Sequence, residues 1–350
     1  MPLESGEFNE LDIPVLSWGA VHRRGGAAIA EMPVLNFEAA ASYSKSEKGS
    51  ALLARVGGQT VFEVYGNGAT SETAALVASV NKSFWGLVLA AMVQDGLAEL
   101  NEPVALTIHE WADDPLKSQI TVDQLLSLTA GLDGVPLGPG PVETYAESLA
   151  APSLAAPGER FHYRPSSFQV FGEWARRKLD PDHPHAVSYL QDRLFDPLDI
   201  EPERWPTETD GFPRMPSSAF LTATELATWG EFVLTGGAVD GKQLVDPDAF
   251  AAVFTPVSAN PAYGLGWWLL SDEPIDAGAE FAAFTGDFLP VMAARDDIPD
   301  EFYVALGGNN TRIYVVPDWD FVLVRMEATP PPPPSAFDDK AFWHALLSAN

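Results

Sequence analysis

Residues 78–96 read ASVNKSFWGLVLAAMVQDG, and this stretch decides how the rest of the chain is interpreted. It is typical of one helix that is apolar on nearly every side from Phe84 to Val93. A lysine, Lys82, nevertheless stands in the first turn, three residues after Ser79. Residues at positions i and i+3 of a helix share a face, so the serine and lysine side chains are expected to meet.

The chemistry of this pair leaves two interpretations open. Ser79 lies near the N-terminus of the expected helix, where free N–H groups and partial positive charge favour a developing oxyanion. Burial lowers the pKa of a lysine, and a neutral amine beside a serine can act as a general base. In the structural alternative, Ser79 caps the helix and Lys82 extends its ammonium group to water.

Composition narrows the class of protein. The chain has 350 residues, 46% of them hydrophobic, which is enough for one large domain or two closely packed ones. Its formal net charge of −29 argues against binding to nucleic acid or to anionic membrane surfaces and favours an acidic protein kept soluble by its charge. No apolar run is long enough to span a membrane. The absence of cysteine excludes disulfides and thiolate chemistry.

Strand signals stand at both ends of the chain and helix signals in the middle. In residues 51–66, two β-rich runs flank Gly57-Gly58, which predicts a hairpin with a two-residue turn. Further strands are expected at 262–270, 301–308, 312–317 and 321–326.

Helices are expected at 120–132, 166–179, 222–237 and 336–350. The first three begin with pairs at capping-box spacing, which are Thr121/Gln124, Ser166/Gln169 and Thr222/Glu225. Gly131 is expected to end the first helix and Gly236-Gly237 the third. Residues 1–45 are expected on the surface, 133–160 as a loop, and 330–334 as a polyproline spacer.

This order predicts an α+β fold, an α/β sandwich in which the N-terminal hairpin and the C-terminal strands share one antiparallel sheet flanked by helices. We expect a single catalytic unit over residues 1–350, with a sheet subdomain at about 45–80 and 255–350. An inserted helical subdomain is expected at about 81–254, with a cleft between the two parts.

Tyr163 is a third candidate residue. It lies in PGERFHYRPSSFQVFGE (157–173), where a Pro/Gly-rich segment enters an expected helix. A tyrosine that faces a cleft can relay a proton between a serine, a lysine and a leaving group. An ordinary core tyrosine is the alternative reading of this residue alone.

Taken together, these motifs resemble the serine β-lactamase and penicillin-binding-protein superfamily, in its class C-like esterase and amide-hydrolase branch. The resemblance runs from about residue 45 to 347 and rests on SVNKSFWGLVLAAMVQDGLAELNEPV (79–104), ITVDQLLSLTAGLDG (120–134), PGERFHY (157–163), YGLGWWLL (263–270) and GGNNTRIYVVPDWDFVLVRM (307–326). It implies a β-lactamase/transpeptidase-like fold with no metal or organic cofactor.

The resemblance also implies roles for individual residues. Ser79 would be the acylated nucleophile, Lys82 its base, and Tyr163 the group that protonates the leaving group and helps to activate water. The oxyanion hole would combine the N–H of Ser79 with one N–H from the strand region around 305–309. The candidates there are Leu306, Gly307, Gly308 and Asn309.

Two departures from the family pattern bear on the substrate. The second motif often reads Tyr-x-Asn, but here Tyr163 is followed by Arg164 and Pro165. The Tyr163-Arg164 pair loosely resembles the 6-aminohexanoate-dimer hydrolase branch. The third motif, usually Lys/His-Thr/Ser-Gly, has no clear counterpart, and ALG or LGG within 305–308 occupies that strand without a cation. Both departures argue against a β-lactamase or a peptidoglycan carboxypeptidase.

Other signals are weaker. The segment 236–243 resembles a P-loop, but Gln243 replaces the Ser or Thr that binds Mg²⁺, so we expect a loop. The segment 180–185 clusters acids with two histidines, and we expect a surface loop. Packing is the expected role of His162, Trp85, Trp267 and Trp268, although each can line the cleft.

The sequence therefore predicts a serine hydrolase that cleaves a small ester or amide through an acyl-enzyme. An acyltransferase with the same residues and a non-catalytic binding protein on this fold are the alternatives. No secretory signal precedes the first motif, so we expect a cytoplasmic protein, or a periplasmic or secreted one if a leader has been removed. The oligomeric state stays open.

Overall fold

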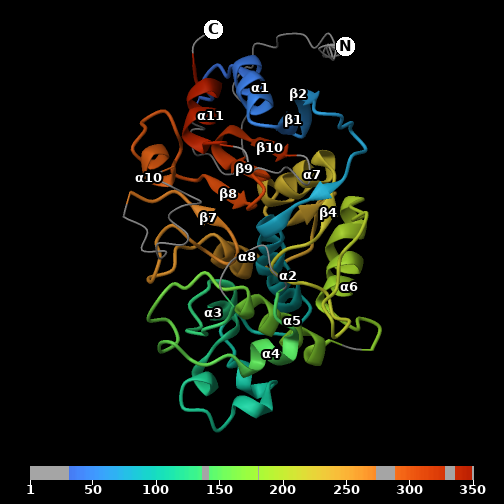
Figure 1. Ribbon diagram of the computed structural model, residues 1–350, viewed down its shortest axis with the longest axis vertical. Coiled ribbons are helices and arrows are strands. Elements are labelled where there is room, and N and C mark those ends of the chain that lie inside the picture. Colours follow the sequence, from blue (N-terminus) through green and yellow to red (C-terminus); the bar gives the residue numbers. More distant parts are fainter. Residues whose placement is uncertain (1–30, 136–141, 180, 273–287, 328–335, 349–350) are drawn as a thin grey trace, which may run out of the picture.

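The computed structural model describes residues 31–135, 142–179, 181–272, 288–327 and 336–348. Residues 1–30 of the expected surface segment and the polyproline run at 330–334 lie outside the described residues. Two halves can be followed in Figure 1, a sheet with its covering helices above and a helical region below.

The main sheet joins the two ends of the chain, as the sequence predicts. Its six strands follow the order β2-β1-β10-β9-β8-β7 and every pairing in it is antiparallel. The strands are β1 (Gly49–Val56), β2 (Gln59–Tyr65), β7 (Trp268–Leu269), β8 (Tyr303–Leu306), β9 (Arg312–Val316) and β10 (Phe321–Glu327). The pairing of β1 with β10 confirms the predicted α+β sandwich.

The turn of the first hairpin has the geometry that its glycines predict. Gly57 and Gly58 have φ angles of 56° and 75°, the left-handed conformations that a type I′ turn requires at both central positions. The strand expected at 262–270 is much shorter, because only Trp268 and Leu269 pair with β8. Residues 263–267 instead form a tight loop, closed by the N–H of Gly264 on the carbonyl of Trp267.

Helices cover both faces of the sheet, and neighbouring residues of β9 show this. The side chain of Tyr314 contacts the ring of Trp343 on α11 (Asp339–Leu346). Ile313 points to the opposite face, against α7 (Ala223–Leu234). Because side chains alternate along a strand, the sheet is buried on both sides. Helix α1 (Phe37–Ser46) packs beside α11 at the top of Figure 1.

The helix expected within residues 78–96 is the most buried α-helix of the described structure. It begins as a 3₁₀ turn, η1 (Ala78–Asn81), and continues as α2 (Lys82–Gln94). Every residue from Lys82 to Met92 is buried. A β-carbon on Gly86 would lie 2.4 Å from the carbonyl oxygen of Leu265, so a glycine is needed where the 263–267 loop crosses the helix.

Helix ends show where local prediction succeeds and fails. The capping box of α7 is present, with Thr222 as N-cap and Glu225 as its partner. The Thr121 capping box of α3 (Val122–Leu126) is also present, but α3 ends at Leu126 rather than at Gly131.

The capping box predicted for α5 (Ser166–Lys178) is wrong, because Pro165 is the N-cap and no side chain caps it. The Ser166 hydroxyl binds the Glu143 carboxylate instead.

Shorter elements complete the described chain. They are the α-helices α4 (Tyr145–Ala150), α6 (Ala186–Leu190), α8 (Pro247–Val253) and α10 (Phe288–Ala293), and the strand pairs β3 (Ala75–Leu76) with β4 (Phe220–Leu221) and β5 (Ala238–Val239) with β6 (Lys242–Gln243). The short 3₁₀ or π turns are η2 (Val104–Leu106), η3 (His109–Trp111), η4 (Lys117–Gln119), η5 (Gln191–Phe195), η6 (Asp196–Leu198) and η7 (Pro317–Trp319). The segment 236–243, expected as a loop, is thus a small hairpin.

Within the described ranges, no helix has the length and apolarity needed to cross a bilayer. The proposed subdomain boundaries stay a prediction, and α7, from the central range, packs on the sheet.

Candidate active site

Ser79 lies in the sharp turn that leads into α2. The residue before it, Ala78, has a φ angle of 48°, a left-handed conformation that is strained for any residue other than glycine. Strand β3 ends at Leu76, so the chain turns from strand to helix within a few residues and leaves the Ser79 side chain partly exposed. Strained turns of this kind concentrate at functional sites.

The amine of Lys82 points at the serine. Its Nζ lies 3.0 Å from the Ser79 Oγ and 3.0 Å from the backbone oxygen of Pro216. Only 2% of the Lys82 side chain is exposed, and burial lowers its pKa from 10.5 to about 7. A large share of the amine is therefore neutral near pH 7, as a general base requires.

Tyr163 completes the cluster. It hydrogen-bonds to Ser79, and the Lys82 Nζ lies 4.8 Å from the centre of its ring. The tyrosine is 4% exposed, and burial raises the pKa of its phenol above the ordinary value of 10, although the hydrogen bond to Ser79 acts in the opposite direction. The phenol is consequently protonated at neutral pH. The structure thus brings together the three residues that the sequence selected.

Aromatic rings from the 263–267 loop and from β7 pack around Tyr163. Trp268 stacks on its ring with centroids 6.1 Å apart, and Tyr263 meets it edge-on at 6.5 Å. Both residues are buried, so Trp268 and its neighbour Trp267 have the packing role that was expected. Neither Tyr263 nor Pro216 is predicted from the sequence, and the backbone oxygen of Pro216 has no side-chain signature that could reveal it.

The candidate oxyanion residues lie in the β8–β9 turn, beside the strand that precedes Ser79. A β-carbon on Gly307 would lie 2.6 Å from the carbonyl oxygen of Val77. The side-chain amide of Asn309 donates to the carbonyl of Leu76. The turn therefore contacts the segment that precedes Ser79 directly.

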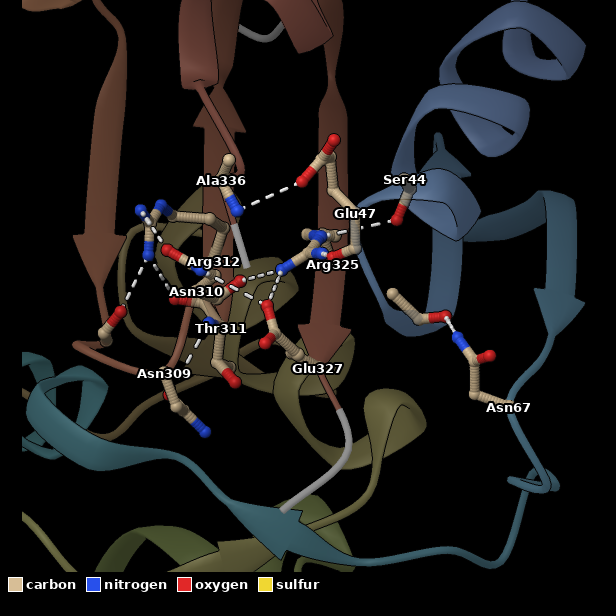
Figure 2. A network of polar contacts seen from close by, with 12 residues as sticks. Ser44, Glu47, Asn67, Asn309, Asn310, Thr311, Arg312, Arg325, Glu327 and Ala336 are labelled. Carbon is tan, nitrogen blue, oxygen red and sulfur yellow. Dashed lines mark hydrogen bonds and ion pairs between the residues drawn. The ribbon is translucent and has the colours of Figure 1, made fainter. Parts of the chain in front are cut away.

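One of the four candidate amides already has a hydrogen-bond acceptor. The N–H of Gly307 donates to the carbonyl of Thr311 at 2.8 Å, which makes Gly307 the least suited of the four to bind an oxyanion. Leu306, Gly308 and Asn309 stay predictions. Figure 2 shows Asn309 and Thr311 in this turn, together with Arg312, whose guanidinium binds the carbonyl of Gly307 at 2.7 Å.

Two of the histidines make structural contacts in the described chain. The Nε2 of His183 lies 3.1 Å from the carboxylate of Asp192, and His185 caps α6 through its Nδ1. His162 is half-buried, and burial, followed by the charge of Arg164, lowers its pKa. Trp85 is fully buried within α2, as expected for a packing residue.

Comparison with known proteins places these features in a family. The family model described as Beta-lactamase matches residues 35–348. The 6-aminohexanoate-dimer hydrolase of Paenarthrobacter ureafaciens is 24% identical, over 95% of this chain and 86% of that protein.

Solved structures agree on the fold. A putative 6-aminohexanoate-dimer hydrolase from Bacillus anthracis superposes with a TM-score of 0.68 at 18% identity, over 93% of this chain and 82% of that one. EstCE1, described as a hydrolase with promiscuous acyltransferase activity, gives a TM-score of 0.65 at 15% identity, over 89% of this chain and 99% of that one. From the family model and the fold together, the chain belongs to the Beta-lactamase family, whose named relatives here are hydrolases.

Proposed function

We propose that this protein is a serine hydrolase that cleaves a small ester or amide through an acyl-enzyme on Ser79. The observation that carries the proposal is the Lys82 amine, buried, 3.0 Å from the serine hydroxyl and shifted to a pKa of about 7. A buried lysine costs stability, and a pair of titratable groups with separated pKa values is typical of acid–base sites.

The pKa directions assign the roles. Lys82 is the group that can be neutral near pH 7, so it accepts the Ser79 proton as Oγ attacks the carbonyl carbon. Tyr163 stays protonated, so it passes a proton to the departing alcohol or amine and is reprotonated from the Lys82 ammonium. In the second half-reaction, water attacks the acyl carbon, the bond from the acyl carbon to the Ser79 Oγ breaks, one water proton passes through the same pair to Oγ, and the carboxylic acid leaves. Each cycle then leaves both residues in their starting states.

The developing oxyanion needs two N–H donors. The N–H of Ser79 is one, and the β8–β9 turn supplies the second from Leu306, Gly308 or Asn309. The loss of one such donor typically raises the barrier by about 3 kcal/mol. The close contact of this turn with Val77 supports its placement over the serine.

The substrate is proposed to be uncharged where it meets β8. Residues 305–307 read Ala-Leu-Gly and bring no cation for a substrate carboxylate. Pro165 offers no side-chain amide at the position where the family often has an asparagine. The names of the similar proteins include a 6-aminohexanoate-dimer hydrolase, a D-stereospecific amidohydrolase and a hydrolase with promiscuous acyltransferase activity, which supports the ester and amide classes.

A fluorophosphonate probe tests the proposal directly. Intact mass and peptide mapping should place one adduct on the peptide that carries Ser79, and Ser79→Ala should abolish it. The matched control is Ser83→Ala, one turn further along α2 and fully buried. An adduct that persists in Ser79→Ala, or folded wild-type protein that never reacts and never turns over an activated ester, would contradict the proposal and favour a binding protein.

Acyl transfer is the second candidate function, favoured by the structural likeness to EstCE1. Adding increasing concentrations of a primary alcohol during ester turnover separates the two. A hydrolase forms mainly acid, whereas an acyltransferase forms mainly the new ester while the total rate of acylation stays constant.

A further inference from the structure

Residues 215–219, a segment distant in sequence from Ser79, run along the nucleophile turn. At one end, the N–H of Val77 donates to the carbonyl of Ala219 at 3.0 Å. The N–H of Ala219 donates in turn to the side-chain oxygen of Asn81 at 3.1 Å. These bonds hold the 215–219 segment on both sides of the reactive serine.

The other end of the segment is held by two buried side chains. The indole N–H of Trp85 donates to the carbonyl of Met215 at 2.6 Å, and the N–H of Met215 donates to the side-chain oxygen of Gln169 at 2.9 Å. Trp85, Gln169 and Met215 are each 0% exposed. Helices α2 and α5 thus hold the two backbone groups of one residue, Met215, which directly precedes the Pro216 carbonyl that binds Lys82.

The segment is strained between these two ends. Ser218 has a φ angle of 143°, which side chains other than glycine rarely adopt. Such a conformation persists only when the surrounding contacts determine it. Without the Trp85 and Gln169 contacts, the segment would relax and move the Pro216 carbonyl.

We propose that Gln169 and Trp85 are positioning residues for catalysis, which hold the 215–219 segment against Lys82 and keep water away from its amine. The inference rests on the proposed function for its kinetic readout. Both side chains hydrogen-bond to the backbone of Met215, so both act through Met215 and Pro216.

Burial is the cause that lowers the Lys82 pKa. The groups that face the amine are Ser79, the carbonyl of Pro216, and the rings of Tyr163 and Phe168. Tyr163 is the titratable member of this set. Because desolvation is the cause, the entry of water should raise the Lys82 pKa from about 7 toward 10.5.

The test uses Gln169→Met and Trp85→Phe, which remove one hydrogen-bonding group each and keep an apolar side chain. The matched controls are Gln243→Met and Trp111→Phe, which lose comparable bonds to backbone carbonyls far from Ser79 in sequence. For all four variants, kcat/KM for p-nitrophenyl butyrate is measured from pH 5 to 10, with the Ser79→Ala rate subtracted.

We expect the acid limb of kcat/KM to move to higher pH by about one unit in Gln169→Met and Trp85→Phe, a loss of about fivefold at pH 7 that disappears at pH 10. In the two control variants, kcat/KM should rise at the same pH as in wild type. Gln169 or Trp85 variants that lose the same factor at every pH, or controls that shift equally, would overturn the proposal. If Trp85→Phe does not fold, Gln169→Met decides.

A readout without substrate separates this inference from the proposed function. In wild type, Lys82 binds a proton more weakly in the folded than in the unfolded state, so it makes the free energy of unfolding rise between pH 7 and 10.5. The rise should be smaller in Gln169→Met than in Gln243→Met. An equal rise refutes the positioning role, whereas a smaller rise in a protein without esterase activity keeps that role and rejects the hydrolase.

Discussion

The amine of Lys82 lies 3.0 Å from the hydroxyl oxygen of Ser79, and burial alone lowers the pKa of that amine. The lysine is 2% exposed, so the fold keeps a cationic group where a neutral one would be more stable. This conflict between stability and reactivity is typical of a functional site.

The first prediction concerns the activity of the wild-type protein against pH. We expect kcat/KM for an activated ester to rise with pH through an apparent pKa of about 7, because only neutral Lys82 accepts the serine proton. Burial raises the pKa of Tyr163, so no fall from its ionisation is expected below pH 10. A stopped assay from pH 5 to 10 measures this dependence. A rise of kcat/KM centred near pH 10 instead of near pH 7 would exclude Lys82 as the base.

The second prediction is that Lys82→Met stabilises the protein at acid pH while abolishing activity. The pKa of Lys82 is lower in the folded than in the unfolded protein. Lys82 therefore destabilises the fold most below about pH 7, and this effect fades as the pH rises to 10.5. Its upper bound is about 5 kcal/mol, and the lost hydrogen bond to Pro216 offsets part of it. Urea unfolding at pH 6 and pH 10 measures the effect. Exposed Lys242→Met is the control, and a gain at pH 6 no larger than at pH 10 would contradict the burial argument.

The third prediction concerns the loop that crosses α2. A β-carbon on Gly266 would lie 2.1 Å from the carbonyl oxygen of Lys82, and its φ angle is 90°. Gly266→Ala should therefore destabilise the fold by about 3 kcal/mol or more, because strain and a backbone clash add. Gly211 has a similar φ of 83° but nothing within 4 Å, so Gly211→Ala should cost only about 1 kcal/mol. If chemical unfolding shows the same loss of stability for Gly266→Ala and Gly211→Ala, the backbone at Gly266 must shift enough to relieve the clash with Lys82.

The fourth prediction concerns the buried ion pair drawn in Figure 2. Arg325 and Glu327 are 0% and 1% exposed, with their charged atoms 3.1 Å apart. Glu327→Leu leaves the guanidinium buried without its carboxylate and should cost about 3–5 kcal/mol. Adding Arg325→Met should recover much of this cost. A double variant less stable than Glu327→Leu would show that the bonds from Arg325 to Ser44 and Asn310 matter more.

The fifth prediction compares two fully buried tyrosines. Within the described chain, the hydroxyl of Tyr263 has no hydrogen-bond partner, whereas that of Tyr314 binds the carboxylate of Asp339. Tyr263→Phe should leave the free energy of unfolding unchanged or raise it by about 1 kcal/mol, since it removes an unsatisfied polar group. Tyr314→Phe should lower it by about 1–3 kcal/mol. Thermal unfolding of both variants measures these changes in stability. A clear loss of stability in Tyr263→Phe would reveal a hydrogen-bond partner for that hydroxyl.

Features that depend on a few adjacent residues followed from the sequence alone. Gly57-Gly58 determines the first turn because glycine adopts positive φ angles freely. Thr222 and Glu225 determine the start of α7 because both bonds of a capping box are local. The spacing of Ser79 and Lys82 places them on one face of the turn whatever surrounds them.

Other features were decided only by the tertiary structure. Ser166 and Gln169 have the spacing of a capping box, yet their side chains bind Glu143 and Met215, which only the packed chain places within reach. Likewise, the sequence selected Lys82 as a candidate base but could not supply its environment. Segments distant along the chain, which bring Tyr163 and the carbonyl of Pro216, exclude water from the amine, and desolvation by such non-local packing sets its pKa.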